Sequence, residues 1–278
     1  MIIIAAFLLF GLVEGIMQYV AVYTRHAQWG WILLPSNPLA LNFQNSLAGP
    51  SLTNLANLFG ANYDGQSILS QIMYAAPHDA VASVLVVASA ILIGMVIGIP
   101  AGYIGGWTDE VLMRVTDAFL AFPFLVLAIA FSVLLGNGFT TVLLALVLIW
   151  WPTYARYFRA QAISLKNRNF IEASKLSGVG PLRIMFRHIF PNSIDPVIAQ
   201  ATLDFGSVIL LYSTLAFLGI GLELGHPEWG AMSSSGVAYF PASWWWTLIP
   251  GLVIMVIVVA FSLIGDRLQD LVGGRLTY

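Results

Sequence analysis

The stretch AVASVLVVASAILIGMVIGIPAGY, residues 80–103, is an apolar run without a single charged side chain. A helix needs about 20 mostly apolar residues to cross the hydrocarbon core of a bilayer, which is roughly 30 Å thick. Lipid offers no partners to backbone polar groups, so only helices and closed barrels span it. Barrel strands alternate polar and apolar residues over segments of about ten, and this stretch does not alternate. It therefore predicts a membrane-spanning helix.

Similar apolar runs recur along the chain of 278 residues. Only 9% of the residues are charged, against about 25% in a soluble domain, so the chain cannot cover an aqueous surface. The first run is too long for a signal peptide and lacks the basic segment that precedes one. We expect an all-α, polytopic membrane bundle with six transmembrane helices, at residues 2–22, 80–103, 111–135, 139–158, 195–218 and 244–265.

A long segment, residues 23–75, separates the first span from the other five and is rich in Asn, Ser and Gly. We expect residues 1–65 to form an N-terminal transmembrane helix with an external loop. Residues 66–278 are expected to form a five-helix core. The chain has no cysteine, which excludes disulfides and thiolate metal sites.

Basic residues predict the orientation of the spans. Seven of the eleven Lys and Arg residues lie between Arg156 and Arg187. If the N-terminus is inside, only Arg25 falls in an external segment. Because Lys and Arg concentrate in short cytoplasmic loops, we expect a multi-pass plasma-membrane protein with the basic loop and both termini in the cytoplasm.

The basic loop has a pattern of its own in EASKLSGVGPLRIMFRHIFP, residues 172–191. A short amphipathic helix is predicted to end at Gly178, and a second is predicted to begin at Pro181 and to end at Pro191. The first helix carries four residues on one face: Phe170, Ala173, Leu176 and Ser177. The simpler interpretation is a loop that only sets orientation. Such a loop needs no helix–Gly–Pro–helix pattern, so we interpret it as a docking knob for a cytoplasmic partner.

The same segment resembles the EAA motif of binding-protein-dependent ABC importer permeases. Ser stands in place of the second Ala of that motif, and the matching residues are Glu172, Ala173, Ser174, Gly178, His188 and Pro191. Four further stretches, residues 103–128, 186–203, 215–232 and 250–272, resemble the dipeptide, oligopeptide and nickel permeases. Their order is similar to that of the C-type subunit of the two permeases in such systems.

The resemblance implies a transmembrane permease subunit of an ATP-driven ABC importer for peptides or similar small solutes. It implies four kinds of partner: a homologous second permease, two cytoplasmic ATPases, an external substrate-binding protein and membrane lipid, with no nucleic acid. The six motif residues, in a coupling loop spanning 160–192, would contact an ATPase. The relatives carry peptides, nickel complexes or oligosaccharides, and the resemblance does not choose among these cargoes.

The chain lacks a GxxxxGK[ST] phosphate loop, the backbone cradle that binds nucleotide phosphates. We therefore expect no enzyme activity and no cofactor on this chain, with ATP and Mg bound by the ATPase subunits. The four histidines show no metal-ligand spacing, so no metal site is expected.

Two carboxylates, Asp204 and Glu14, are expected at membrane depth, where burial is costly and ionisable groups are functional candidates. Asp204 is the candidate for the substrate pathway, and a cap or a pairing within the permease dimer is the alternative. Near the third span an ion pair is expected around Arg114, because acidic residues flank it at helical spacing: Asp109, Glu110 and Asp117.

Three further patterns carry expectations about packing. Glycines at four-residue intervals, Gly94, Gly98 and Gly102, predict close helix packing. The run of residues 244–246, all Trp, is typical of an interfacial aromatic belt. HPEWG, residues 226–230, is expected outside, as a gate-proximal turn that touches the binding protein or as a packed segment.

Two other classes of protein compete with the permease. A secondary transporter or channel subunit without ATPase partners would show intramembrane carboxylates or broken helices in paired halves. The sequence has no evident repeat. An intramembrane enzyme would need facing Asp residues, a Ser/His pair or an HExxH motif, and none is evident. We favour the permease.

Overall fold

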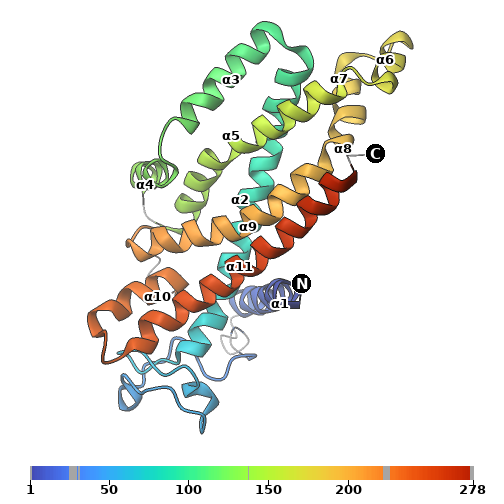
Figure 1. Cartoon of the computed structure of the whole chain (residues 1–278). Helices are drawn as coiled ribbons and strands as arrows, with labels where there is room; N and C mark the ends of the chain where they lie inside the picture. The colour runs from blue at the N-terminus through green and yellow to red at the C-terminus, as the bar shows by residue number, and fades with distance from the viewer. Residues whose placement is uncertain (1, 25–29, 31, 137, 222–225, 276–278) are drawn as a thin grey trace. The chain divides into compact units, whose positions relative to one another are not determined.

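A computed structural model describes residues 2–24, 30, 32–136, 138–221 and 226–275. Arg25, on which the expected orientation partly depends, lies outside these residues. The described part holds no β-strand, only an isolated antiparallel bridge between Ala61 and Ser67. Its α-helices (Figure 1) are α1 (Ile2–Thr24), α2 (Ile68–Ile104), α3 (Gly106–Leu120), α4 (Phe124–Leu135), α5 (Phe139–Leu165), α6 (Asn169–Leu176), α7 (Pro181–Ile184), α8 (Phe190–Asn192), α9 (Ile194–Phe217), α10 (Trp229–Gly236) and α11 (Trp244–Arg275).

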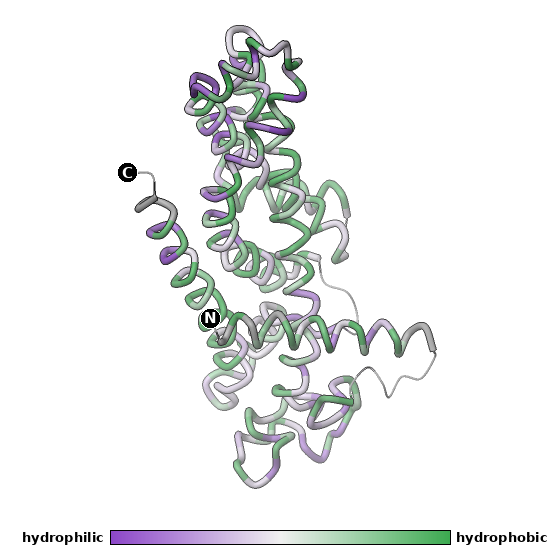
Figure 2. The backbone as a smooth tube through the Cα atoms, turned by 90° about the vertical axis from the view of Figure 1, so that its right-hand side faces the viewer, coloured by the Kyte–Doolittle hydropathy of each residue, from purple (hydrophilic) through white to green (hydrophobic). Residues whose placement is uncertain are grey.

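Four of the described helices, α2, α5, α9 and α11, are each long and apolar enough to cross a membrane. They cover the second, fourth, fifth and sixth expected spans, which confirms the all-α membrane class. Figure 2 shows apolar residues along most of the tube, with the hydrophilic residues of α11 gathered near its C-terminal end. The helix α1 covers the first expected span, but its apolar described part, Leu9–Ala21, is shorter than the other four.

The third expected span, residues 111–135, is not one straight helix. It is divided between α3 and α4, whose axes differ by 89° across a short break. Pro123 lies in this break. Proline disfavours the helical conformation of the residue before it and has no N–H to donate, so the helix ends before Phe122. The pair counts as a fifth span only if both halves belong to one crossing.

The chain divides into two compact units whose borders run through the long helices. Unit 1 comprises Met1–Val84, Leu135–Val142 and Gly206–Phe261. Unit 2 comprises Leu85–Leu134, Leu143–Phe205 and Ser262–Tyr278. The boundary expected at residues 65 and 66 stays a prediction.

In unit 1, residues 32–67 form an ordered segment between α1 and α2. Its amide side chains pair with each other, because Asn45 Nδ2 donates to Asn57 Oδ1 at 2.8 Å and Asn57 Nδ2 donates to Asn45 Oδ1 at 2.9 Å. The Trp245 indole donates to the carbonyl oxygen of Ala61 at 3.2 Å. Trp246 is buried, so of the three tryptophans expected in an interfacial belt only Trp244 is exposed.

In unit 2, α2 packs closely against α5 through the three glycines at four-residue intervals. A Cβ atom on Gly98 would overlap the carbonyl oxygen of Ala155 and lie 2.9 Å from Phe158 Cβ. A Cβ on Gly102 would lie 2.5 Å from the carbonyl oxygen of Arg159. The small-residue pattern therefore works as predicted, bringing two backbones into contact where lipid supplies little hydrophobic force between helices.

Candidate functional site

The first short helix of the basic loop is α6, and it places Glu172 in its first turn. A carboxylate there suits the positive end of the helix dipole. Ile171 is buried and fixes the helix to unit 2. The face predicted from the sequence points the other way, since Phe170, Ala173, Leu176 and Ser177 are all exposed.

The end of α6 has the backbone conformation predicted from Gly178. This glycine has φ +75°, a left-handed value that costs other residues energy. Its N–H donates to the carbonyl oxygen of Lys175 at 3.0 Å, and Val179 N–H donates to that of Ser174 at 3.1 Å. These bonds satisfy carbonyls that the helix end leaves free. Pro181, three residues after Gly178, begins α7, as expected.

The second helix of the loop differs from the prediction at its end. After α7 the chain makes a π-helical turn at Met185–Ile189, and Pro191 then lies inside α8 rather than ending the helix. Proline cannot donate a backbone hydrogen bond, and a π-bulge is a local way of rearranging such bonds. Helical turns therefore continue, with a short interruption at Ser193, into α9.

Large apolar side chains of this loop are exposed although the segment is basic. Leu176 is 90% exposed and Leu182 is 67% exposed. Phe170 and Phe186 are also exposed. The opposite side of the loop carries four buried side chains, which pack against the rest of unit 2: Ile171, Ile184, Met185 and Ile189. Exposed apolar side chains that are rimmed by polar ones mark protein contacts, so we define Phe170, Leu176, Leu182 and Phe186 as the apolar docking face.

Two lysines connect the loop to the C-terminal end of α2. Lys166 Nζ donates to the carbonyl oxygen of Gly102 at 2.9 Å, where the negative end of the α2 dipole favours a cation. Lys175 Nζ lies 5.5 Å from the centre of the Tyr103 ring, within the range of a cation–π contact. These two lysines therefore help to hold the loop against the end of α2.

Ion pairs between α3 and α5 were not predictable from local spacing. The expected pair of Arg114 with Glu110 is present at 3.0 Å. However, Asp117 pairs with Arg156 at 2.7 Å and Asp109 pairs with Arg159, partners 39 and 50 residues away in sequence. Helical periodicity finds only neighbours within a turn or so. The only sign of these pairs in the sequence was that acidic residues cluster on α3 and basic residues on α5.

We expect the Asp109–Arg159 pair to stabilise the protein only modestly. Its side chains are 21% and 37% exposed, and exposed ion pairs contribute about 0.2–1 kcal/mol. A double-mutant cycle with Asp109→Asn and Arg159→Gln, measured by thermal unfolding, should give a coupling free energy below about 1 kcal/mol. The more exposed Glu110–Arg114 pair is the control and should give less, so a larger value for that pair contradicts the ranking by burial.

The predicted motif residues occupy two parts of the loop. Glu172, Ala173 and Ser174 lie on α6, and Gly178 follows its end. His188 is half-buried in the π-helical turn, and Pro191 is exposed in α8. The carbonyl oxygen of His188 accepts from Asn192 Nδ2 at 2.6 Å. The exposed residues of the motif are therefore Glu172, Ala173 and Gly178 around α6, together with Pro191 in α8.

Asp204 lies on α9, outside this loop, and is 7% exposed. Its Oδ1 accepts from Gln200 Nε2 at 3.0 Å, and Gln200 Oε1 accepts from the Tyr157 hydroxyl at 2.8 Å. These bonds join α9 to α5 in unit 2. The arrangement favours a packed polar network, and a role for Asp204 in the substrate pathway stays a prediction. Glu14, the other expected carboxylate, is buried on α1.

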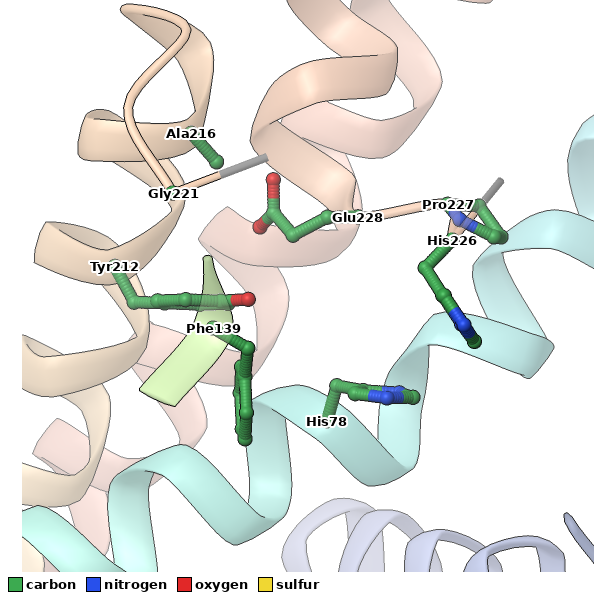
Figure 3. Close-up of a pocket in the computed structure, with 8 residues that line it drawn as sticks. All are labelled: His78, Phe139, Tyr212, Ala216, Gly221, His226, Pro227 and Glu228. Atoms are coloured by element: carbon green, nitrogen blue, oxygen red, sulfur yellow. The ribbon is translucent and has the colours of Figure 1, made fainter. Parts of the chain in front are cut away.

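The HPEWG segment is partly a packed element. Glu228 is the N-cap of α10 and accepts from Ala231 N–H at 2.8 Å. Trp229 is fully buried and donates from Nε1 to the carbonyl oxygen of Ile72 at 2.9 Å. His226 is exposed and lines a small cavity with Glu228, shown in Figure 3.

The architecture and sequence both match known transport proteins. Residues 94–278 match the family model of the binding-protein-dependent transport system inner membrane component. A chain of the inward-facing MetNI methionine ABC transporter aligns with a TM-score of 0.52 at 19% identity, over 69% of this chain and 93% of that chain. At this identity the alignment shows the fold alone.

Curated relatives match over most of their length. The dipeptide transport system permease protein DppC of Alkalihalophilus pseudofirmus is 38% identical over 86% of this chain and 78% of the relative. The nickel transport system permease protein NikC of Escherichia coli is 36% identical over 92% of this chain and 90% of the relative. These matches confirm the predicted family, and the chain belongs to the binding-protein-dependent transport system inner membrane components, as a multi-pass ABC importer permease.

Proposed function

We propose that this permease forms half of a translocation pathway and couples to a cytoplasmic ATPase through the loop 160–192. The observation that carries the proposal is the apolar docking face on an ordered, basic, helical loop. Glu172 and the exposed residues from Ala173 to Gly178 would enter a cleft on the ATPase. A short helix is stiff enough to transmit a movement that a flexible loop would absorb.

The proposed complex contains a homologous second permease, two ATPase subunits and an external substrate-binding protein. ATP and Mg are bound by the ATPases, and this chain acts as a conduit rather than an enzyme. Both termini and the docking face lie on the cytoplasmic side, since ten of the eleven Lys and Arg residues fall in segments assigned to that side or at their helix ends. The cargo is a peptide or a comparable small solute, in line with the names of the dipeptide and nickel relatives.

Purification of the tagged permease from its native membrane tests the assembly. We expect two ATPase subunits and a second permease to co-purify, and we expect ATP hydrolysis to rise when the loaded binding protein is added. Replacing Leu176 by Asp should weaken ATPase capture, because a charge would be placed on the docking face. Leu52→Asp is the control, because Leu52 is 92% exposed in the segment 32–67. Val126→Asp on α4 is unsuitable, because a charge on that apolar helix would hinder membrane insertion.

A secondary transporter or channel remains the rival function. A stable homo-oligomer that transports solute without any ATPase would establish that rival and overturn the proposal. Retention of full ATPase capture by Leu176→Asp, with Leu52→Asp also unaffected, would leave the complex standing but move the docking surface elsewhere.

A further inference from the structure

A small cavity in unit 1 is built from α2, the first residue of α5, the end of α9 and the turn before α10. Figure 3 shows the Glu228 carboxylate and the Tyr212 hydroxyl pointing toward the same space, with the rings of Phe139 and His78 beside it. Glu228, Tyr212 and Ala216 are buried at its floor, and His226 is exposed at its rim. The cavity volume is about 20 Å³, and one water molecule needs about 10–15 Å³. It therefore admits one water-sized group from the rim.

The wall of the cavity is a chain of aromatic rings. The ring centres of Tyr212 and Phe139 are 5.9 Å apart, those of Phe139 and His78 are 5.5 Å apart, and those of His78 and His226 are 5.5 Å apart. The faces of Phe139 and Tyr212 attract cations through the ring quadrupole, most strongly where water is displaced. These two rings favour a cation over an anion.

The carboxyl group of Glu228 forms part of the same wall. Glu228 is held in position by two donors, the Ser213 hydroxyl at 3.0 Å and Ala231 N–H at 2.8 Å. Burial raises the pKa of Glu228, and the hydrogen bonds from α10 oppose that effect. Asp79, next to His78 in sequence, interacts electrostatically with Glu228. Asp79 is fully buried, and neither of its carboxylate oxygens has a hydrogen-bond partner among the described residues.

Two neighbouring buried carboxylates are costly unless a proton neutralises one of them or a positive charge accompanies them. None of the ion pairs found among the described residues includes Asp79 or Glu228. The same residues hold no group of three His, Cys, Asp or Glu side chains arranged to bind a metal ion. Hard metal cations also require several oxygen ligands, whereas this wall is mostly aromatic. An ammonium group fits the size, the charge and the lining.

We propose that this cavity binds a single ammonium group, either of a free amine or of the transported solute, with Glu228 as its direct partner and Asp79 as a second negative charge. The link to the solute rests on the proposed function: a peptide with a free amino end would present this group on the external side of the pathway. The binding of an ammonium group does not depend on that function.

Thermal unfolding of the purified permease complex, followed by tryptophan fluorescence, tests the site. Methylammonium chloride is expected to raise Tm by about 3 °C in a saturable way, since a ligand that binds only the folded state stabilises it. Sodium chloride, potassium chloride and tetramethylammonium chloride at equal ionic strength should not raise Tm. The two alkali ions find few oxygen ligands on a mostly aromatic wall, and tetramethylammonium is too large for the cavity. An equal shift with potassium would make it an alkali-ion site. No shift with any of the salts would mean that the carboxylate pair holds a proton. Either result overturns the proposal.

Two variants test whether methylammonium binds at Glu228 and Asp79. Glu228→Gln should weaken the apparent affinity for methylammonium by at least about tenfold, as expected for loss of a hydrogen bond to a charged group. Because that change also alters the α10 cap, Asp79→Asn provides a second test that leaves the cap intact, with the same direction of effect. Glu110→Gln, an exposed carboxylate of α3, is the matched control and should keep the wild-type shift. Loss of the shift in this control, or its retention in both cavity variants, contradicts the assignment.

Uptake by the reconstituted complex separates the two sources of the group. With saturating loaded binding protein, Asp79→Asn should slow uptake of a dipeptide with a free amino end more than uptake of its N-acetylated counterpart. If methylammonium binds but the ratio of the two uptake rates is unchanged, the group comes from a free amine and the link to the solute is wrong. Absence of ATP-driven uptake in the wild type would instead contradict the proposed function and leave the unfolding result standing.

Discussion

Gly98→Leu is expected to abolish recovery of folded permease. At this position a Cβ atom already overlaps the carbonyl oxygen of Ala155 and lies 2.9 Å from Phe158 Cβ. A leucine would have to separate the backbones of α2 and α5. Overpacking usually costs about 1–3 kcal/mol and sometimes more, and here the obstacle is backbone rather than a movable side chain. We expect a loss of at least about 4 kcal/mol, comparable with the whole stability of many domains.

The measurement is the yield of monodisperse protein in fluorescence-detected size-exclusion chromatography, together with Tm. Val96→Leu is the matched control, because Val96 lies on the same helix and is 56% exposed. Gly98→Ala should give an intermediate yield, since a single methyl group meets the same carbonyl. Equal yields of Gly98→Leu and Val96→Leu would show that α2 and α5 do not depend on this contact.

Gly178→Leu is expected to leave insertion intact and to uncouple ATP hydrolysis from uptake. A Cβ on Gly178 meets nothing within 4 Å, so bulk is tolerated, but φ is +75°. A left-handed conformation costs a non-glycine residue about 1–2 kcal/mol, which lowers the equilibrium constant for forming the native turn by about tenfold. Uptake by the reconstituted complex should fall by up to a similar factor, while hydrolysis continues.

Two variants separate backbone strain from side-chain bulk. Gly180 is also open to solvent, but its φ is −64°, so Gly180→Leu adds the same bulk without strain and should retain more uptake. Asn tolerates the left-handed region better than other residues, so Gly178→Asn should recover part of the activity. If Gly180→Leu and Gly178→Leu lose uptake equally, the effect comes from bulk on the docking surface. Unchanged uptake by Gly178→Leu would contradict a coupling role for this turn.

Much of the fold was predictable because local physics decides it. Apolar runs such as residues 80–103 must become helices in lipid. Gly178 ends one short helix and Pro181 begins the next, because of the backbone conformations that these residues favour. The four-residue glycine spacing on α2 predicted close packing because one helical face repeats with that interval. These features need no knowledge of distant residues.

Features that join distant residues were missed. The pairs of Asp109 with Arg159 and of Asp117 with Arg156 depend on how α3 meets α5. The break between α3 and α4 was also missed, because the apolar run continues through Pro123 and hydropathy does not register the missing N–H. The cavity at Glu228 brings together residues from four segments, and its histidines looked unrelated in sequence. Asp79 carried a signal, as an acid within an apolar helix, but no local pattern linked it to Glu228.

The turn at Gly178 has a consequence for how such transporters diversify. Its shape follows from one backbone torsion and two main-chain hydrogen bonds, so side chains on α6 contribute little to it. Substitutions at exposed positions such as Leu176 can then accumulate without changing the conformation of the turn. The surface that we propose to contact an ATPase can therefore change by substitution, while the turn, which depends on this glycine, keeps its shape.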